Sequence, residues 1–107
     1  MIKVKATPKF IRLAKKYMTL DTLQNLIDSL AVDPEQGIII KDTGGIRKLR
    51  WQTGKGGGKR DGLRILYYYD GLQLTLLITL FKKADKANIN AGEKVELRKL
   101  INELFGD

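Results

Sequence analysis

Three basic side chains occupy positions where paired strands would bring them together. In the segment "GIRKLRWQ", Lys48 and Arg50 alternate with apolar neighbours, which is the period of a half-buried strand. In "LRILYYY", Arg64 and Tyr68 occupy alternate positions of a second strand. If the two strands pair as a hairpin, the three cations share one face of the sheet. Clustered ammonium and guanidinium groups bind phosphate, so this pattern favours contact with a nucleic acid.

A second interpretation of the same charges is open on the residues alone. An antiparallel sheet commonly has one solvated face, and charges can lie there for solubility. Against this, all three side chains have the same sign, and like charges on neighbouring strands repel one another.

The glycine-rich segment "TGKGGGKRDG" lies between the two strands. A Walker loop has the pattern G-x-x-x-x-G-K-[ST] and leads into a helix. If Gly58-Lys59 ended such a loop, its first glycine would fall on Thr53, and Arg60 would replace the magnesium-binding hydroxyl. Both flanks are expected to be strands, so a nucleotide-phosphate loop is disfavoured. We expect a hairpin loop whose Lys55, Lys59 and Arg60 either contact an RNA backbone or are simply solvated.

Composition narrows the chemistry further. The 107 residues include 20 Lys and Arg against 12 Asp and Glu, a net charge of +8, with no cysteine and no histidine. Disulfides, thiolate metal sites and histidine bases are therefore excluded, and we expect neither cofactor nor metal. No apolar run approaches the roughly 20 residues of a membrane span, and the N-terminus lacks a signal-peptide core. These features predict a soluble, cytoplasmic protein with no membrane partner.

The first third of the chain predicts one strand and two helices. "IKVKA" alternates apolar and charged residues as a strand does. Thr7 followed by proline predicts a helix N-terminus, and a second helix is expected from Thr19 to Asp33, which precedes another proline.

The rest of the chain predicts three strands and a last helix. Asp70-Gly71 is a strong signal for a two-residue hairpin, and the strand "LQLTLLITLF" beyond it is apolar on both faces, as a central strand should be. Asn90 can cap a final helix, with Glu93 at the third position and Gly106 at the end. The expected order is β-α-α-β-β-β-α: an α+β domain with an antiparallel meander, an N-terminal strand, and the helical hairpin and C-terminal helix packed on one face.

The segment "TGGIRKLRWQTGKGGGKRDGLRILYYY", followed by "LLITLFKK" and a capped helix, resembles the RelE/HigB superfamily of bacterial toxins. It is most similar to the HigB-like branch, whose toxins have a T-G-G-[aliphatic]-R-K-[aliphatic]-R strand, a Gly/Lys loop, an R-[aliphatic]-[aliphatic]-Y-Y-[aromatic] strand, and an aromatic-x-K before the last helix. The resemblance covers residues 43–105 well. It implies a single RelE-like domain over residues 1–107, related in fold to microbial ribonucleases.

The activity that this resemblance implies is that of an mRNA interferase. Such toxins are metal-independent endoribonucleases that enter the A site of the ribosome and cut the bound message, which inhibits translation. The implied chemistry is attack of a ribose 2′-OH on the adjacent phosphate, which leaves a 2′,3′-cyclic phosphate and a 5′-OH. Arginine and lysine can stabilise the charge that develops, and positioning by the ribosome would supply much of the rest.

The resemblance also implies roles for particular residues. Arg64 is expected to bind the phosphate in the transition state, because arginine is bidentate and always charged. Lys48 is the first candidate for general base or acid, provided that its neighbours favour its neutral form. The full set of candidate catalytic residues is Lys48, Arg50, Arg64, Lys83 and Tyr68; the candidate RNA- or ribosome-binding residues are Arg47, Lys55, Lys59, Arg60 and Lys82.

Two positions depart from the RelE pattern. Beyond Lys83, where that branch has an arginine and later a tyrosine, this chain has Ala84 and Asn90. Whether Tyr68 covers the missing role is open, whereas core packing is favoured for Tyr67 and Tyr69. These departures favour an alternative function, a non-catalytic RNA- or ribosome-binding module with the same basic face.

The partners implied are mRNA, the 70S ribosome and a cognate antitoxin. HigB-like toxins often pair with helix-turn-helix antitoxins, and the complex then binds operator DNA through the antitoxin. An acidic or amphipathic segment laid on the basic sheet face would block the site.

Overall fold

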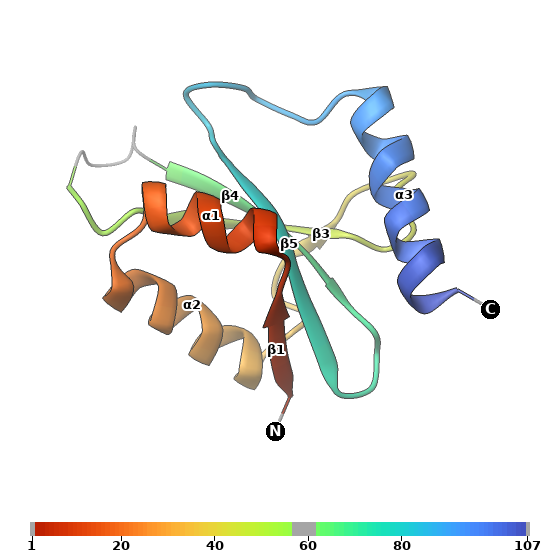
Figure 1. The fold of residues 1–107 in the computed structure, drawn as a ribbon, viewed down its shortest axis with the longest axis horizontal. Helices are drawn as coiled ribbons and strands as arrows, with labels where there is room; N and C mark the ends of the chain where they lie inside the picture. Colours follow the sequence, from red (N-terminus) through yellow and green to blue (C-terminus); the bar gives the residue numbers. More distant parts are fainter. Residues whose placement is uncertain (1, 57–61, 107) are drawn as a thin grey trace.

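The computed structural model of the chain describes residues 2–56 and 62–106. Within them it is an α+β fold, with three helices and a five-stranded mixed sheet (Figure 1). The elements in chain order are β1 (Lys3–Ala6), α1 (Pro8–Tyr17), α2 (Leu20–Val32), β2 (Ile38–Ile39), β3 (Arg47–Gln52), β4 (Gly62–Tyr69), β5 (Leu74–Lys82) and α3 (Ala91–Phe105).

The sheet has the strand order β1-β5-β4-β3-β2. Strand β1 runs parallel to β5, with Lys3 opposite Leu74, and all other neighbouring pairs are antiparallel. The meander of β3, β4 and β5 was expected from the sequence, and β5 lies inside the sheet as expected, although β4 is the middle strand. Strand β2 was not: Ile38 and Ile39 add a short fifth strand along the edge of β3.

The helix boundaries follow from local hydrogen bonds, as the sequence predicted. The hydroxyl of Thr7 accepts a hydrogen bond from the Phe10 amide at 3.0 Å, and Pro8 fits the first turn because it has no N–H to satisfy. At α3, the Asn90 side chain accepts from the Glu93 amide at 2.8 Å, while Glu93 accepts from the Asn90 amide at 3.0 Å. This reciprocal capping box fixes where α3 begins.

The turn between β4 and β5 is longer than the two residues expected. It comprises residues 70–73, and the Asp70 carboxylate accepts hydrogen bonds from the amides of residues 72, 73 and 74. Gly71 adopts a φ of 80°, which only glycine reaches without strain. The Asp-Gly signal therefore located the turn correctly but not its length.

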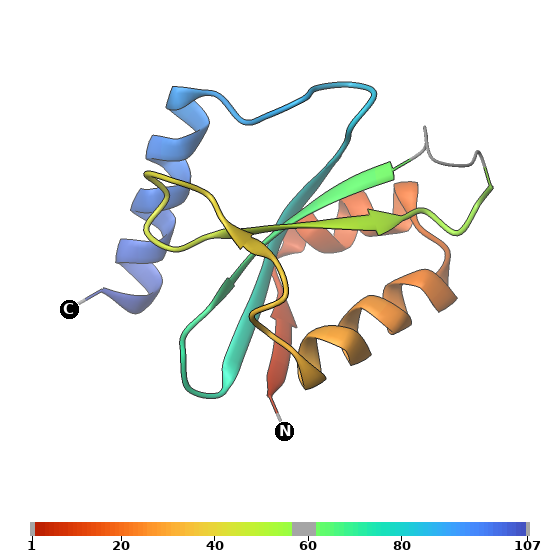
Figure 2. The same cartoon turned by 180° about the vertical axis from the view of Figure 1, so that it is seen from behind.

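The helices cover both faces of the sheet, not one face as the sequence analysis expected. Phe10 and Ala14 of α1 and Leu26 and Leu30 of α2 pack on the face formed by alternate β4 residues such as Ile65. On the opposite face, Ile101 of α3 packs with Leu66, Ile78 and Ile46. Figures 1 and 2 show α1 and α2 together and α3 apart from them. The physical reason is that β4 and β5 are apolar on both faces, so each face must be buried.

No helix among the described residues has the length and apolar character needed to cross a membrane.

Candidate functional site

Strands β3 and β4 bring three cations onto the face that α3 partly covers. In the register of this pair, Arg50 lies directly opposite Arg64, and Lys48 lies opposite Leu66. Because side chains on directly opposite residues point to the same face, Lys48, Arg50 and Arg64 share the face of the buried Leu66. This is the arrangement that the alternation in the sequence predicted.

These three side chains line one cavity together with a fourth cation. The cavity has a volume of about 510 Å³. Lys83 reaches it from the end of β5, where the Lys83 amide donates to the Gly62 carbonyl at 3.1 Å and so continues the pairing with β4. The complete lining is Gln36, Ile38, Lys48, Leu49, Arg50, Arg64, Lys83, Ala87 and Asn88. We call this cavity the basic pocket.

Arg64 is the most deeply placed of the four cations, with 8% of its surface exposed. Among the described residues, its guanidinium donates one hydrogen bond, to the Leu63 carbonyl at 3.3 Å. Burial, and then the charge of Arg50, lower the pKa of Arg64 from its usual value. An arginine nevertheless stays charged at any ordinary pH, so this side chain is a buried cation.

No carboxylate compensates this charge within the part of the chain that the structure describes. The lining of the basic pocket contains no Asp or Glu, and the ion pairs found among the described residues join Arg47 to Glu35 and Lys86 to Glu93. A buried charge is costly unless it is paired. The pocket therefore has the electrostatics of an anion-binding site.

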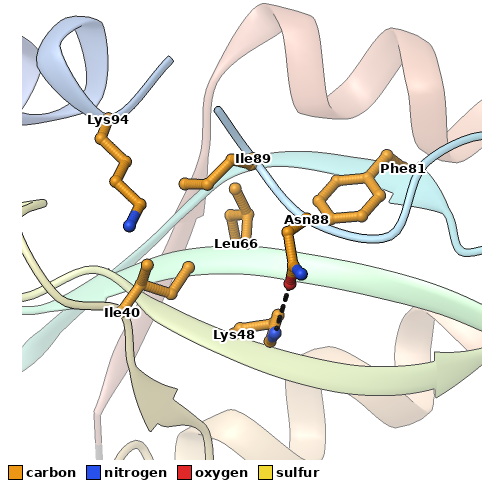
Figure 3. Close-up of a pocket in the computed structure, with 7 residues that line it drawn as sticks. All are labelled: Ile40, Lys48, Leu66, Phe81, Asn88, Ile89 and Lys94. Carbon is orange, nitrogen blue, oxygen red and sulfur yellow. Dashed lines mark hydrogen bonds between the residues drawn. The ribbon is translucent and has the colours of Figure 1, made fainter. Parts of the chain in front are cut away.

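The loop between β5 and α3 forms one wall of the pocket. Its Asn88 accepts a hydrogen bond from the Lys48 ammonium at 3.4 Å (Figure 3). The loop is anchored on both sides of Asn88: before it by an ion pair between Lys86 and Glu93, and after it by the capping box of Asn90. The Lys86 side chain, followed by the Asn90 amide, holds the pKa of Glu93 below its ordinary value. Asn88 was not singled out from the sequence, where a lone asparagine in a polar loop carries no distinguishing signal.

Tyr68 does not join the other candidate catalytic residues. Its ring packs against the ring of Phe105 near the end of α3, with 4.7 Å between the centroids. It belongs to the apolar cluster under α3 and is absent from the lining of the basic pocket. The structure thus gives Tyr68 a packing role, as it does for the fully buried Tyr67; Tyr69, for which core packing was also favoured, is only half-buried.

Arg47 faces away from the pocket and holds the chain that leads into β2. Its guanidinium donates to the carbonyls of Glu35 at 3.0 Å and Gly37 at 2.8 Å, and it pairs with the Glu35 carboxylate at 3.6 Å. The Gly37 amide donates to the buried Tyr67 hydroxyl at 2.8 Å. A Cβ at Gly37 would lie 2.9 Å from that hydroxyl, so only glycine fits here. Arg47 thus makes internal contacts, and its expected contact with RNA stays a prediction.

The other candidate RNA-binding residues lie near α1 or outside the described chain. Lys55 donates to the Lys16 carbonyl at the end of α1, at 2.9 Å. The Lys82 ammonium lies 5.9 Å from the centroid of the Tyr17 ring. Lys59 and Arg60, together with most of the glycine loop, fall outside the described residues.

The two residues that depart from the RelE pattern, Ala84 and Asn90, both lie at the surface near the start of α3 or in the loop before it. Ala84 is exposed in the loop after β5, and Asn90 is the N-cap of α3. The Asn90 side chain therefore has a structural function, as the cap of α3.

A scan of the sequence against protein-family models gives no match. Four cations can hold a phosphate and stabilise added negative charge on it.

Proposed function

We propose that the chain is the toxin of a type II toxin–antitoxin system, an endoribonuclease that cuts mRNA in the ribosomal A site. The observation that carries the proposal is the buried, uncompensated Arg64 at the centre of four cations. A protein retains such a charge at a cost to stability, which is typical of a site selected for binding. Its size and sign suit the phosphodiester of an RNA strand.

In the proposed reaction the 2′-oxygen forms a bond to phosphorus, and the bond between phosphorus and the 5′-oxygen of the next nucleotide breaks. The proton of the 2′-OH passes to Lys48, a step that requires Lys48 as the neutral amine and leaves it as the ammonium, and the leaving 5′-oxygen takes a proton from a group or water on the opposite side. Arg64 and Arg50 hold the non-bridging oxygens, whose charge increases as the fifth bond forms. Lys83 neutralises the adjacent backbone.

The fold is compatible with this proposal. The order of helices and strands is roughly compatible with the order β-α-α-β-β-β-α expected of a RelE-like domain, with the short β2 in addition. Membership of the RelE/HigB superfamily remains part of the proposal, as do the ribosome as the site of action and a helix-turn-helix antitoxin as partner. An acidic antitoxin segment would complement the basic pocket by charge.

The test is to map new 5′ ends of cellular mRNA after a brief pulse of expression. Wild type is expected to produce cuts confined to translated regions, whereas Arg64→Met is expected to produce none. Arg12→Met is the matched control, because Arg12 is exposed on α1 and remote from the basic pocket. Cuts that persist in Arg64→Met would remove Arg64 from the mechanism.

A second function, a non-catalytic RNA- or ribosome-binding module, is favoured by one specific observation. The described lining of the basic pocket contains no histidine, carboxylate or tyrosine, the side chains that most often act as general bases along with lysine. Crosslinking distinguishes the two functions. RNA bound to wild type and lost in Arg64→Met, with no new 5′ ends in either, would leave a binding module.

A further inference from the structure

One wall of the basic pocket is a loop segment with few contacts of its own. Ala87 and Asn88 of this wall lie in the loop between β5 and α3, and both are exposed. Apart from the packing of Ile89 under α3, the segment 87–89 makes one contact that holds it. Within the described chain this is the hydrogen bond that Asn88 Oδ1 accepts from the Lys48 ammonium. The position of the wall therefore depends on the residues on either side of the segment.

We infer that Glu93 of α3 is a positioning residue of the basic pocket, which through Lys86 holds the wall that carries Asn88. The inference rests on the proposed phosphate site. Neither Glu93 nor Lys86 lines the basic pocket. Glu93 can therefore affect a bound phosphate only through the residues that it holds or through its charge.

The Glu93 carboxylate uses its two oxygens for two different residues of the loop. Its Oε1 accepts a hydrogen bond from the Asn90 amide at 3.0 Å, and its Oε2 accepts one from the Lys86 ammonium. These two residues lie on either side of the segment 87–89, so one carboxylate closes the chain from 86 to 90 into a small loop. Closure removes many of the conformations that the segment could otherwise adopt.

The Lys86 residue also ties this closed loop to the sheet. Its ammonium lies 5.0 Å from the centroid of the Phe81 ring, within the range of a cation–π contact. Phe81 belongs to β5 and lies directly opposite Arg64 of β4. The Lys86 amide in addition donates to the Lys82 carbonyl at 3.3 Å. The wall is thus fixed relative to the two strands that carry the buried cation.

The wall matters for binding because it orients Lys48. Asn88 Oδ1 accepts one of the three N–H groups of the Lys48 ammonium, at 3.4 Å, which leaves two of them for a phosphate (Figure 3). If the wall moved away, this ammonium would lose its described partner and its fixed direction. Phosphate binding would then include the entropy cost of ordering a lysine side chain.

The test uses Glu93→Gln, which separates the two hydrogen bonds of the carboxylate. Glutamine keeps one oxygen for the Asn90 amide, so the capping box survives, but its NH2 group cannot accept from Lys86. The order of the backbone amides of residues 87–89 is measured by NMR relaxation. Binding of inorganic phosphate is followed by NMR on the Arg64 guanidinium.

The charge of Glu93 and its positioning role have opposite effects on phosphate affinity. Loss of a negative charge near a cationic pocket strengthens phosphate binding, whereas a loosened wall weakens it. We expect Glu93→Gln to bind phosphate about threefold more weakly than wild type, in line with the loss of a partly exposed ion pair. We also expect the order parameters of the amides of 87–89 to fall from about 0.85 to below about 0.6.

Glu96→Gln is the matched control. It removes the same charge at an exposed position one turn further along α3. We expect this variant to keep the order of residues 87–89 and to bind phosphate as tightly as wild type or slightly more tightly.

A double variant tests whether the effect passes through Asn88. Asn88→Ala removes the acceptor for Lys48 and should weaken phosphate binding by a similar factor. Adding Glu93→Gln should then cause no further weakening, because two residues that act through one contact do not contribute additively. A general effect of Glu93 on the stability of α3 would instead add to that of Asn88→Ala.

The outcomes distinguish failure of this inference from failure of the proposed function. Unchanged order of residues 87–89 in Glu93→Gln, or phosphate binding as tight as in wild type, would overturn the positioning role and leave the phosphate site standing. Additive weakening in the double variant would overturn the route through Asn88. A wild-type chain that does not bind phosphate would overturn the proposed phosphate site, and the order of residues 87–89 would still decide whether Glu93 holds the wall.

Discussion

Replacing Arg64 by methionine should make the protein more stable while removing its ability to bind phosphate. Methionine fills a similar volume and is flexible enough to adapt to the site. Arg64 of the wild type is 8% exposed, lies opposite Arg50 and makes one side-chain hydrogen bond to the described residues, at 3.3 Å. Its only described partner is therefore a backbone carbonyl, not an anion.

The size of the effect follows from two opposing contributions. Replacing buried charges with well-packed apolar groups is often neutral or stabilising by about 1–4 kcal/mol, and relief of a like-charge cross-strand pair adds about 0.2–1 kcal/mol. Loss of the hydrogen bond to the Leu63 carbonyl costs about 1.5–3 kcal/mol, since its donor is charged. We expect a net gain of about 1 kcal/mol, equivalent to about 4–8 °C in melting temperature for a chain of this size.

The assay is urea unfolding at low ionic strength, with and without inorganic phosphate. At a phosphate concentration 100 times the dissociation constant, binding to the native state should stabilise wild type by about 2.7 kcal/mol. The same phosphate should leave Arg64→Met almost unchanged, and sodium chloride at matched ionic strength controls for screening. Two results would refute the reasoning: destabilisation of Arg64→Met by more than about 1 kcal/mol, or equal stabilisation of both proteins by phosphate.

Three further predictions concern the framework around the site. Tyr67→Phe removes the buried partner of the Gly37 amide and should cost about 1–3 kcal/mol in urea unfolding. Burial raises the pKa of Tyr67 in the folded protein. The stability that its neutral hydroxyl contributes is therefore complete below about pH 10 and is lost as the pH rises through the pKa of the folded state. The phenylalanine variant should not show this loss of stability at alkaline pH. The backbone amides of Leu74 and its neighbours lower the pKa of Asp70. The stability that the Asp70 carboxylate contributes is therefore present above about pH 4 and is lost as the pH falls through the pKa of the folded state. In an acid titration, the free energy of unfolding of Asp70→Ala should fall less than that of wild type. Asn90→Ala removes the N-cap of α3 and should lower the free energy of unfolding by about 1 kcal/mol, whereas an unchanged urea midpoint would contradict the capping role.

The sequence predicted those parts of the fold that depend on neighbouring residues. The caps at Thr7 and Asn90 and the alternation along β3 and β4 are local signals, and the structure confirms each of them. Strand β2 was not predicted, because its two isoleucines are too few to show the alternation of apolar and polar residues that marks a strand. The placement of α3 on the opposite face could have been predicted from the sequence, because a strand that is apolar on both faces must be covered on both faces.

In the candidate site, too, the residues placed by local sequence patterns were predicted correctly, whereas those with contacts to distant segments were not. The side chains of Lys48, Arg50 and Arg64 were placed together correctly because hairpin register follows from alternation. Arg47 and Tyr68 were assigned to function because their environments depend on distant partners, Glu35 in one case and Phe105 in the other. Charge and aromaticity in a sequence do not reveal whether a remote segment has already engaged the side chain.

The position of β5 has a consequence for the order in which the protein can form during synthesis. It is the strand between β1 and β4, yet it is the last strand to be translated. Strand β1 and the start of α1 must wait for it: the Thr7 hydroxyl donates to the Ile78 carbonyl, 71 residues further along the chain. Long-range pairing of this kind makes folding slow compared with helical proteins of the same size.

The basic pocket also cannot form until β5 and the residues after it have been translated. Its last contributions, Lys83 and Asn88, follow β5, and the loop that carries them is anchored only when the first turn of α3 has been made. A nascent chain that still lacks these residues holds Arg50 and Arg64 on an incomplete sheet. Phosphate binding is therefore expected to begin only after the first turn of α3 has been translated.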